Sequence, residues 1–485
     1  MRPLNLVFAL VILLLFREPL LASPPQGKSA LFRKITAAIA EKDYPSGSVG
    51  VCIQDVSSGK TIVAVNADSF YIPASVSKLV TGAMGLELLG LDYTFQTNAY
   101  IDGDLNRESG ELDGTLYIQG RGDPGFLVER MWLFVQHLSH LGITSIRKDL
   151  VLDDFFFDSV FCGPGFGEEK TSRSYEATIG ALSAGFNCVA IHVRPGDTVG
   201  APVQVDLFPP LKDVHLVATA KTIAPLRRDK IEVKTEKVDD RTGVFVYGSM
   251  HVDAEPRYIF RKTWHSWKNF GNTLQGLFDK SKITLAGTVR HEKVPDSLEK
   301  RGPFYTFESL PFTEYLRHMF KYSSNFAAEM IFKTIAAEND SIPGSWEGGE
   351  RVALEWWKDN GLPGTPVIKN GSGMGKVNRL KPAQVVALLR HAHGKKEYAP
   401  DYVSLLSVAG VDGTLKDRFA RSRLKGIMRA KTGTLNDHGV STLAGYVLMP
   451  EKTWAFALLI NNKNVSQITH WELQQEILHL AVPSE

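Results

Sequence analysis

The chain has 485 residues, 44% of them hydrophobic, and its 55 Lys and Arg residues nearly balance 53 Asp and Glu residues. This length exceeds the roughly 250–300 residues at which a single core stops growing, so we expect two or three domains. The formal net charge of +2 gives no reason to expect nucleic acid as a partner.

The N-terminal residues have the pattern of an export signal. An apolar run over residues 4–16 carries no charge, and Arg17-Glu18 follow it, ahead of Leu20-Leu21-Ala22-Ser23. The run is shorter than the ~20 residues that span a bilayer but matches the apolar core of a signal peptide. We therefore expect residues 1–23 to be a signal peptide and the mature chain to be exported. The charged pair leaves open a retained anchor, and a peripheral membrane association also stays open.

Helical patterns predominate in the first and last parts of the mature chain, and strand-like patterns predominate between them. Residues 30–41 have helical spacing, residues 48–54 and 61–65 predict a hairpin, and residues 74–89 are apolar at helical period directly after Pro73. From residue 93 to about 253, short strand-like runs lie between Gly, Asp and Pro residues, at 116–119, 150–152, 189–193 and 243–247. Helical patterns return at 312–337, 348–360, 382–391 and 465–481, with two strands at 442–448 and 454–460.

This order predicts a discontinuous arrangement of domains. Residues 24–92 and 254–485 are expected to form one domain, and residues 93–253 an inserted β-rich region of one or two small domains. Three cysteines, Cys52, Cys162 and Cys188, permit at most one disulfide, for which Cys162 and Cys188 are the nearest pair. Three buried free thiols are the alternative, which we prefer. No metal-site spacing such as H-E-x-x-H occurs, and we expect neither a metal nor another cofactor.

The first motif with chemical meaning is Ser75-Val76-Ser77-Lys78, at the start of the helix predicted over residues 74–89. Side chains at i and i+3 share a helix face, so the Lys78 amine can reach the Ser75 hydroxyl. A serine hydroxyl is a weak nucleophile until a base takes its proton, and a lysine can be that base where burial lowers its pKa. Ser75 is thus the candidate nucleophile and Lys78 the candidate base. Other Ser-x-x-Lys matches lack this helical context, and they begin at Ser57, Ser145, Ser297 and Ser422.

Two further motifs follow in the chain. Ser323-Ser324-Asn325 lies within or beside the helix predicted over residues 312–337. The Ser323 hydroxyl can relay a proton between the Lys78 amine and the leaving group, and the Asn325 amide can bind a substrate carbonyl. Alone, this motif is also compatible with the solvated face of a helix.

The third motif is Lys431-Thr432-Gly433-Thr434, at the start of a strand-like region. Lys431 offers a positive charge to a substrate carboxylate, which the hydroxyls of Thr432 and Thr434 can also bind. Gly433 lets the strand edge approach a ligand closely. Alone, the motif is also compatible with a turn that leads into a strand.

Ser-x-x-Lys, Ser-x-Asn and Lys-Thr-Gly in this order are typical of penicillin-interacting serine enzymes. Several flanking segments strengthen the likeness: Gly122-Asp123-Pro124, Tyr175, residues 183–187, Gly371-Ser372-Gly373, Asn378-Arg379 and residues 409–415. With them, the chain resembles the penicillin-binding protein 4 type of D-alanyl-D-alanine carboxypeptidase/endopeptidase over most of its mature length. It departs from that family at Met374-Gly375-Lys376, where the family has Leu-Ser-Arg, and at Ser324, where other penicillin-interacting enzymes often have Asp.

The resemblance implies an α/β fold of the penicillin-recognising serine transpeptidase/β-lactamase-like type. An antiparallel sheet flanked by helices would carry a helical lobe with Ser323 and Asn325, and the β-rich domains would be inserted. The implied activity is that of a serine D-Ala-D-Ala carboxypeptidase, and also of a DD-endopeptidase, in the periplasm. It would act on peptidoglycan stem peptides through an acyl-enzyme on Ser75 and be inhibited by β-lactams. The oxyanion would lie between the backbone N–H groups of Ser75 and Thr434.

Two alternatives stay open at this point. A β-lactamase would share the acylation step, but the long insertion and the lack of a recognisable deacylating Glu motif argue against it. A non-catalytic β-lactam or cell-wall sensor would need a strong membrane-spanning helix and a cytoplasmic partner domain, and neither is visible in the sequence. The oligomeric state is not predicted.

Overall fold

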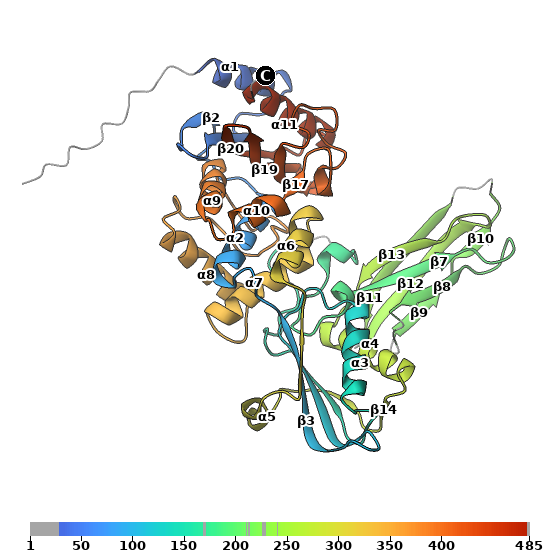
Figure 1. The fold of residues 1–485 in the computed structure, drawn as a ribbon. Coiled ribbons are helices and arrows are strands. Elements are labelled where there is room, and N and C mark those ends of the chain that lie inside the picture. The colour runs from blue at the N-terminus through green and yellow to red at the C-terminus, as the bar shows by residue number, and fades with distance from the viewer. Residues whose placement is uncertain are drawn as a thin grey trace, which may run out of the picture.

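The computed structural model describes residues 29–167, 171–209, 211, 214–225, 229–239 and 241–482. In this part of the chain, a domain of sheet and helices lies at one end and two β-rich bodies lie at the other (Figure 1). The predicted signal peptide lies outside the described residues. Among the helices that are described, none is long and apolar enough to cross a membrane.

A six-stranded antiparallel sheet forms the centre of the first domain. Its strands, in spatial order, are β17 (Ser407–Val408), β18 (Met428–Leu435), β19 (Val440–Met449), β20 (Lys452–Asn461), β1 (Val49–Asp55) and β2 (Thr61–Val65). β1 pairs with β20 along its whole length, with Val49 opposite Ile460. The first and last strands of this domain are therefore neighbours in the sheet. The hairpin and the two late strands predicted from the sequence are confirmed.

Helices cover both faces of this sheet. α1 (Ala30–Glu41) and α11 (Gln467–Ala481) pack on one face, where Val51 of β1 joins their core. Cys52, the next residue of the same strand, belongs to the core on the other face, because successive side chains of a strand point to opposite sides. The helices in that second core form a lobe: α2 (Lys78–Leu88), α6 (Phe312–Lys321), α7 (Asn325–Asn339), α8 (Trp346–Asp359), α9 (Pro382–Gly394) and α10 (Ala399–Leu405).

α7 is the central helix of the lobe, and all of residues 326–337 are buried. Its start corrects the sequence-based expectation of one helix over residues 312–337, because α6 ends at Lys321 and α7 begins only at Asn325. Ser323 has φ 61°, a left-handed conformation that does not continue a helix. The Ser324 hydroxyl then accepts a hydrogen bond from the Ala327 N–H at 3.1 Å, which caps the new helix.

The first β-rich body is a seven-stranded mixed sheet. Its strands are β3 (Gln96–Asn106), β4 (Glu111–Gly120), β5 (Ser145–Ile146), β6 (Leu150–Asp153), β14 (Thr284–Leu285), β15 (Val289–His291) and β16 (Tyr305–Glu308). Two helices that the sequence analysis did not predict, α3 (Val128–His140) and α4 (Ser266–Lys280), share a core with one face. α5 (Asp296–Arg301) contributes Leu298 to a small cluster with Tyr100 and Tyr117 of the sheet.

The second β-rich body is a sandwich of two small sheets around a valine-rich core. One sheet has the order β13 (Arg257–Lys262), β7 (Cys188–Arg194), β8 (Gln204–Phe208). In the other sheet, β12 (Arg241–His251) pairs with β9 (Val214–Ala218), β10 (Lys221–Ile223) and β11 (Lys230–Val238). Valine side chains from both sheets, such as Val189 and Val244, are fully buried between them.

The sheets of the inserted region extend past residue 253, where the sequence analysis placed its end. β13 pairs with β7, and β16 pairs with β3. Both pairings join strands from the two sides of residue 253, so strand pairing continues to Glu308.

All three cysteines lie in the described part of the chain and are free thiols. The bridge between Cys162 and Cys188 is therefore absent, and the alternative of free thiols holds. The expectation that all three thiols are buried is wrong for Cys162, which is exposed, whereas Cys52 and Cys188 are buried.

Candidate active site

A short 3-10 turn, Ala74–Ser77, leads directly into α2 and brings the first motif together. Lys78 Nζ donates a hydrogen bond to Ser75 Oγ at 2.8 Å. The contact expected from the i, i+3 spacing is present. Ala74 has φ 46°, so the backbone directly before the nucleophile candidate is in a conformation that few residues other than glycine adopt.

The Lys78 amine is fully buried and has three hydrogen-bond partners. Besides Ser75, it donates to Asn325 Oδ1 and to the Ser372 carbonyl, both at 2.8 Å. Burial lowers the pKa of Lys78 to about 7, and the nearby Glu329 carboxylate opposes this shift. A neutral Lys78 keeps two N–H donors for Asn325 and Ser372, while its lone pair can accept the Ser75 proton. The geometry thus suits a general base.

The second motif contacts the lysines of the first and third motifs, both of which are buried. Asn325 contacts Lys78, whereas Ser323 Oγ accepts a hydrogen bond from Lys431 Nζ at 2.8 Å. The sequence analysis expected Ser323 to exchange a proton with Lys78, but its hydrogen bond in the structure is to Lys431. Burial lowers the pKa of Lys431 well below its usual value, and the Lys78 cation lowers it further. The Lys78 amine is therefore held near the Ser75 hydroxyl, and the Lys431 amine is held near the Ser323 hydroxyl.

The third motif lies on β18, beside the nucleophile candidate. A Cβ atom on Gly433 would come within 2.9 Å of the Ser75 backbone nitrogen and 2.3 Å of Thr442 Oγ1. Only glycine permits this approach of the strand to Ser75. Thr434 is exposed beside it, and Thr432 Oγ1 donates to Thr414 Oγ1 at 2.8 Å.

Residues from all three motifs line one cavity of about 700 Å³. Ser75, Ser323, Asn325 and Thr434 are among its lining residues. The sequence analysis did not assign several further lining residues to the site, and they are Thr171, Arg173, Gly373, Met374, Leu435, Asn436 and Asp437. Thr171 and Arg173 precede β7 in the inserted region, which therefore contributes to the wall of the cavity.

Comparison with known proteins identifies the family of the chain. Residues 31–481 match the D-Ala-D-Ala carboxypeptidase 3 (S13) family. The chain belongs to this family. It is 29% identical to a D-alanyl-D-alanine carboxypeptidase of Actinomadura sp. (strain R39), over 92% of this chain and 84% of that protein. It is 23% identical to the D-alanyl-D-alanine carboxypeptidase DacB of Haemophilus influenzae, over 86% of each.

The fold is similar to that of solved structures. The crystal structure of penicillin binding protein 4 from Haemophilus influenzae superposes with a TM-score of 0.79 at 21% identity, covering 92% of this chain and 98% of that one. A structure of the same Haemophilus protein complexed with a β-lactam gives a TM-score of 0.73. The predicted penicillin-recognising fold with additional β-rich sheets is confirmed. The protein is a serine D-Ala-D-Ala carboxypeptidase, as the sequence indicated.

A buried carboxylate fixes the loop that holds the Lys78 amine of this S13 carboxypeptidase. Glu329, in the middle of α7, is fully buried. It accepts hydrogen bonds from the N–H groups of Gly371 at 3.1 Å and Ser372 at 2.9 Å, and from Trp346 Nε1 at 2.8 Å. A buried carboxylate needs such donors, and here they orient the Ser372 carbonyl toward Lys78. The sequence contained a signal for this role, a lone Glu inside an apolar run.

The segment Met374-Gly375-Lys376, which departs from the family pattern described in the sequence analysis, begins at the wall of the cavity. Met374 Sδ is 3.6 Å from Asn325 Nδ2, and Met374 lines the cavity. A Cβ atom on Gly375 would come within 2.7 Å of the Gly165 Cα atom, so the glycine permits close backbone packing. Lys376 is exposed.

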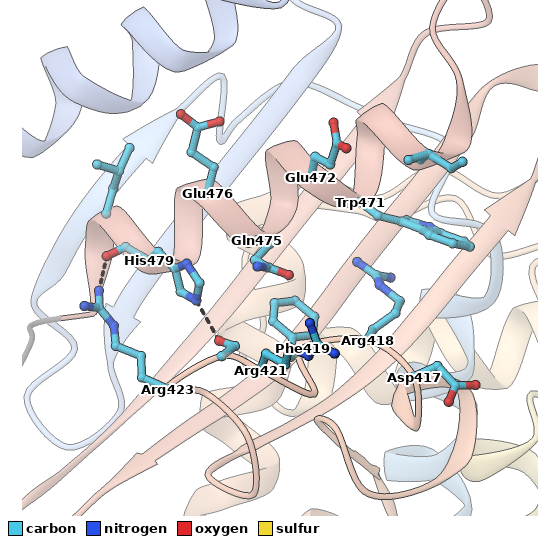
Figure 2. A pocket seen from close by; sticks show the side chains of 13 residues that line it. Asp417, Arg418, Phe419, Arg421, Arg423, Trp471, Glu472, Gln475, Glu476 and His479 are labelled. Atoms are coloured by element: carbon cyan, nitrogen blue, oxygen red, sulfur yellow. Dashed lines mark hydrogen bonds between the residues drawn. The ribbon is translucent and has the colours of Figure 1, made fainter.

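A second hollow, of about 730 Å³, lies between residues 417–423 and α11 (Figure 2). Of the described residues that line it, none belongs to the three motifs. It contains a serine and histidine in contact, Ser422 Oγ and His479 Nε2 at 2.6 Å. The Ser422 hydroxyl, however, also accepts from the Leu424 N–H at 3.1 Å, and Arg418 is bound to Gln474 at 2.8 Å. These contacts stabilise the loop against α11, and we assign the chemistry of the carboxypeptidase to the first cavity.

Proposed function

We propose that this S13 carboxypeptidase removes the terminal D-Ala of peptidoglycan stem peptides through an acyl-enzyme on Ser75. The observation that carries the proposal is the 2.8 Å contact of Ser75 Oγ with the buried Lys78 amine. Lys78 takes the hydroxyl proton while Ser75 Oγ attacks the carbonyl of the penultimate D-Ala. The developing oxyanion accepts hydrogen bonds from the N–H groups of Ser75 and Thr434.

The remaining motif residues bind the substrate or transfer a proton to its leaving group. Ser323, bound to Lys431, delivers a proton to the leaving D-Ala amine as the peptide bond breaks. Asn325 keeps its Oδ1 on Lys78 and turns its Nδ2 from the Tyr175 carbonyl, 3.1 Å away, to a substrate carbonyl. Lys431, Thr432 and Thr434 bind the terminal carboxylate, and Gly433 admits the peptide beside the strand. Water then hydrolyses the ester and regenerates Ser75.

The same site is proposed to react with β-lactams and to cleave cross-links. A β-lactam presents an amide carbonyl and a nearby carboxylate, which match the groups recognised here, and the Haemophilus influenzae relative has been crystallised with a β-lactam. In a cross-link, D-Ala is joined to a diamino acid, so the same attack gives endopeptidase activity. Export to the periplasm, where this substrate lies, is proposed from the N-terminal pattern.

Mass spectrometry of the intact protein after incubation with benzylpenicillin tests this proposal. We expect one adduct of the mass of penicillin, and digestion should locate it on the peptide that contains Ser75. The turn serine Ser57, which begins another Ser-x-x-Lys sequence, provides an internal control. An adduct on Ser57, or release of D-Ala by a protein that never forms an adduct, would overturn the mechanism.

The acylation rate is expected to increase with pH because Lys78 acts as a base only when neutral. With a pKa of about 7, its neutral fraction falls about tenfold per pH unit below 7 and levels off above. The second-order rate constant for benzylpenicillin should follow this curve between pH 5 and 9. A rate that is constant over this range, or that decreases with pH, would contradict the assignment.

Replacing Lys431 by Ala is expected to remove the preference for a free terminal carboxylate. A charge-assisted hydrogen bond contributes about 1.5–3 kcal/mol, a factor of roughly ten to over a hundred. In the wild type, kcat/KM for a D-Ala-D-Ala peptide should exceed that for its C-terminal amide by this factor, and in the variant the two should be similar. Lys425→Ala, at an exposed lysine, is the matched control. Equal losses for both peptides would instead assign Lys431 to the proton transfer through Ser323.

A further inference from the structure

A third cavity, of about 450 Å³, adjoins the catalytic one on the side of the inserted region. Tyr175, Ser323 and Asn325 line both of these cavities, so this one is a continuation of the catalytic cavity. We call it the aromatic groove, after its lining residues Phe186, Phe208, Phe260, His318, Tyr322 and Phe326. The mechanism above uses none of these six side chains.

The two walls of the aromatic groove come from different parts of the fold. On the β-sandwich, Phe208 ends β8 and Phe260 lies on β13, and they are 49% and 55% exposed. On the other wall, the rings of Phe186 and His318 stack with centroids 5.3 Å apart and an interplanar angle of 10°. Tyr322, 70% exposed, lies next to His318. Large aromatic side chains exposed together at a cavity indicate a ligand site.

The aromatic groove is nearly uncharged. Among the described residues that line it, Glu129 is the one carboxylate, and there is no Lys or Arg. Burial lowers the pKa of His318, which favours the neutral ring at pH 7. The catalytic cavity differs, since Arg173 and Asp437 line it. A charged ligand would lose water in the groove without gaining a counter-charge, so the groove fits a neutral ligand.

We propose that the aromatic groove binds the N-acetylated sugars of the glycan strand to which the stem peptide is attached. This inference rests on the proposed function, since it places a further part of the same substrate. Pyranose rings combine apolar C–H faces, which pack on aromatic rings, with uncharged polar edges. The stem peptide carries free carboxylates and fits the charged catalytic cavity better. The glycan is the neutral part of the substrate.

The test compares two substrates that share one peptide. kcat/KM is measured for a free stem pentapeptide and for the same pentapeptide linked to the N-acetylglucosamine–N-acetylmuramic acid disaccharide. We expect the linked substrate to be favoured roughly five- to tenfold by the wild type, the effect of one or two good aromatic contacts. Phe260→Ala should bring this ratio close to one and leave the free peptide unchanged. Trp132→Ala removes an aromatic side chain of similar exposure, 47%, outside the groove and should keep the ratio.

A binding measurement keeps the test independent of catalysis. A neutral β-1,4-linked N-acetylglucosamine tetramer is titrated into the Ser75→Ala protein, and saturable binding should be lost on adding Phe260→Ala or Phe208→Ala. If the wild type cleaves neither the free nor the linked pentapeptide, the proposed function itself is wrong. If both substrates are cleaved equally and the tetramer does not bind, the glycan site is wrong while the function stands. If Phe260→Ala lowers kcat/KM equally for both substrates, the groove holds peptide, and this also overturns the proposal.

Discussion

Ser75→Ala is expected to abolish penicillin acylation and to lower D-Ala release by roughly 10⁶-fold, the loss seen when a serine hydrolase loses its nucleophile. The reason is geometric, because Ser75 is the hydroxyl that contacts Lys78 Nζ in the described structure. Ser372 also contacts that amine, but through its carbonyl oxygen. Its own hydroxyl accepts from the Met374 N–H at 3.1 Å and is not placed for attack.

The measurement is the rate of D-Ala release from a pentapeptide together with the yield of the penicillin adduct. A thermal unfolding curve close to that of the wild type shows that the fold is intact, since the substitution removes one oxygen atom. Ser57→Ala is the matched control, at a turn where the hydroxyl contacts Asp55 at 2.7 Å, and it should retain full activity. Peptidase activity of Ser75→Ala within tenfold of the wild type would disprove the nucleophile assignment.

Lys78→Arg is expected to lower acylation by roughly 10²–10⁴-fold, nearly as much as Lys78→Ala, because a general base contributes about this factor. The charge is conserved in the Arg variant, but a guanidinium does not give up its proton at neutral pH. A large loss of acylation in the Arg variant would therefore show that Lys78 acts as a base and not only as a fixed positive charge. Acylation is measured with benzylpenicillin at pH 7 and at pH 9.

A rescue experiment controls for misfolding of the Lys78 variants. Lys78→Ala leaves a cavity beside Ser75, and a small primary amine added in excess should restore part of the acylation rate in proportion to its unprotonated fraction. The Lys78→Arg variant leaves no such space, so the added amine should not restore its acylation rate. Near-wild-type acylation by Lys78→Arg would mean that the residue acts as a charge only.

The sequence predicted which motifs share one site better than it predicted the contacts within that site. The motifs at 75–78, 323–325 and 431–434 meet at one cavity, because short motifs report directly which functional groups are present. The partner of each group depends on tertiary geometry. Ser323 contacts Lys431 and Asn325 contacts Lys78, and Ser323 lies in a left-handed break between two helices, which the helical pattern does not reveal.

The fold was predicted best where one face of an element is buried and worst in the inserted region. α3 has buried residues at Met131, Phe134, Val135 and Leu138, a helical spacing that was present but lay among strand-like runs. The end of the inserted region could not be placed, because strands such as β13 and β16 pair with partners far away in the sequence. Local patterns report that a segment is a strand and not which sheet it joins.

The pairing of β1 with β20 has a consequence for how the enzyme is made. Ser75 follows β2 early in the chain, and β1 pairs with β2 at once, but its other neighbour, β20, is synthesised only near the C-terminal end. The strands of the two β-rich bodies are complete by Glu308, and each body has its own core, so both can fold first. Pairing over so long a separation is slow. An unfinished or truncated chain therefore contains Ser75 without the complete sheet beside it, and we expect hydrolytic activity only when the last strand is in place.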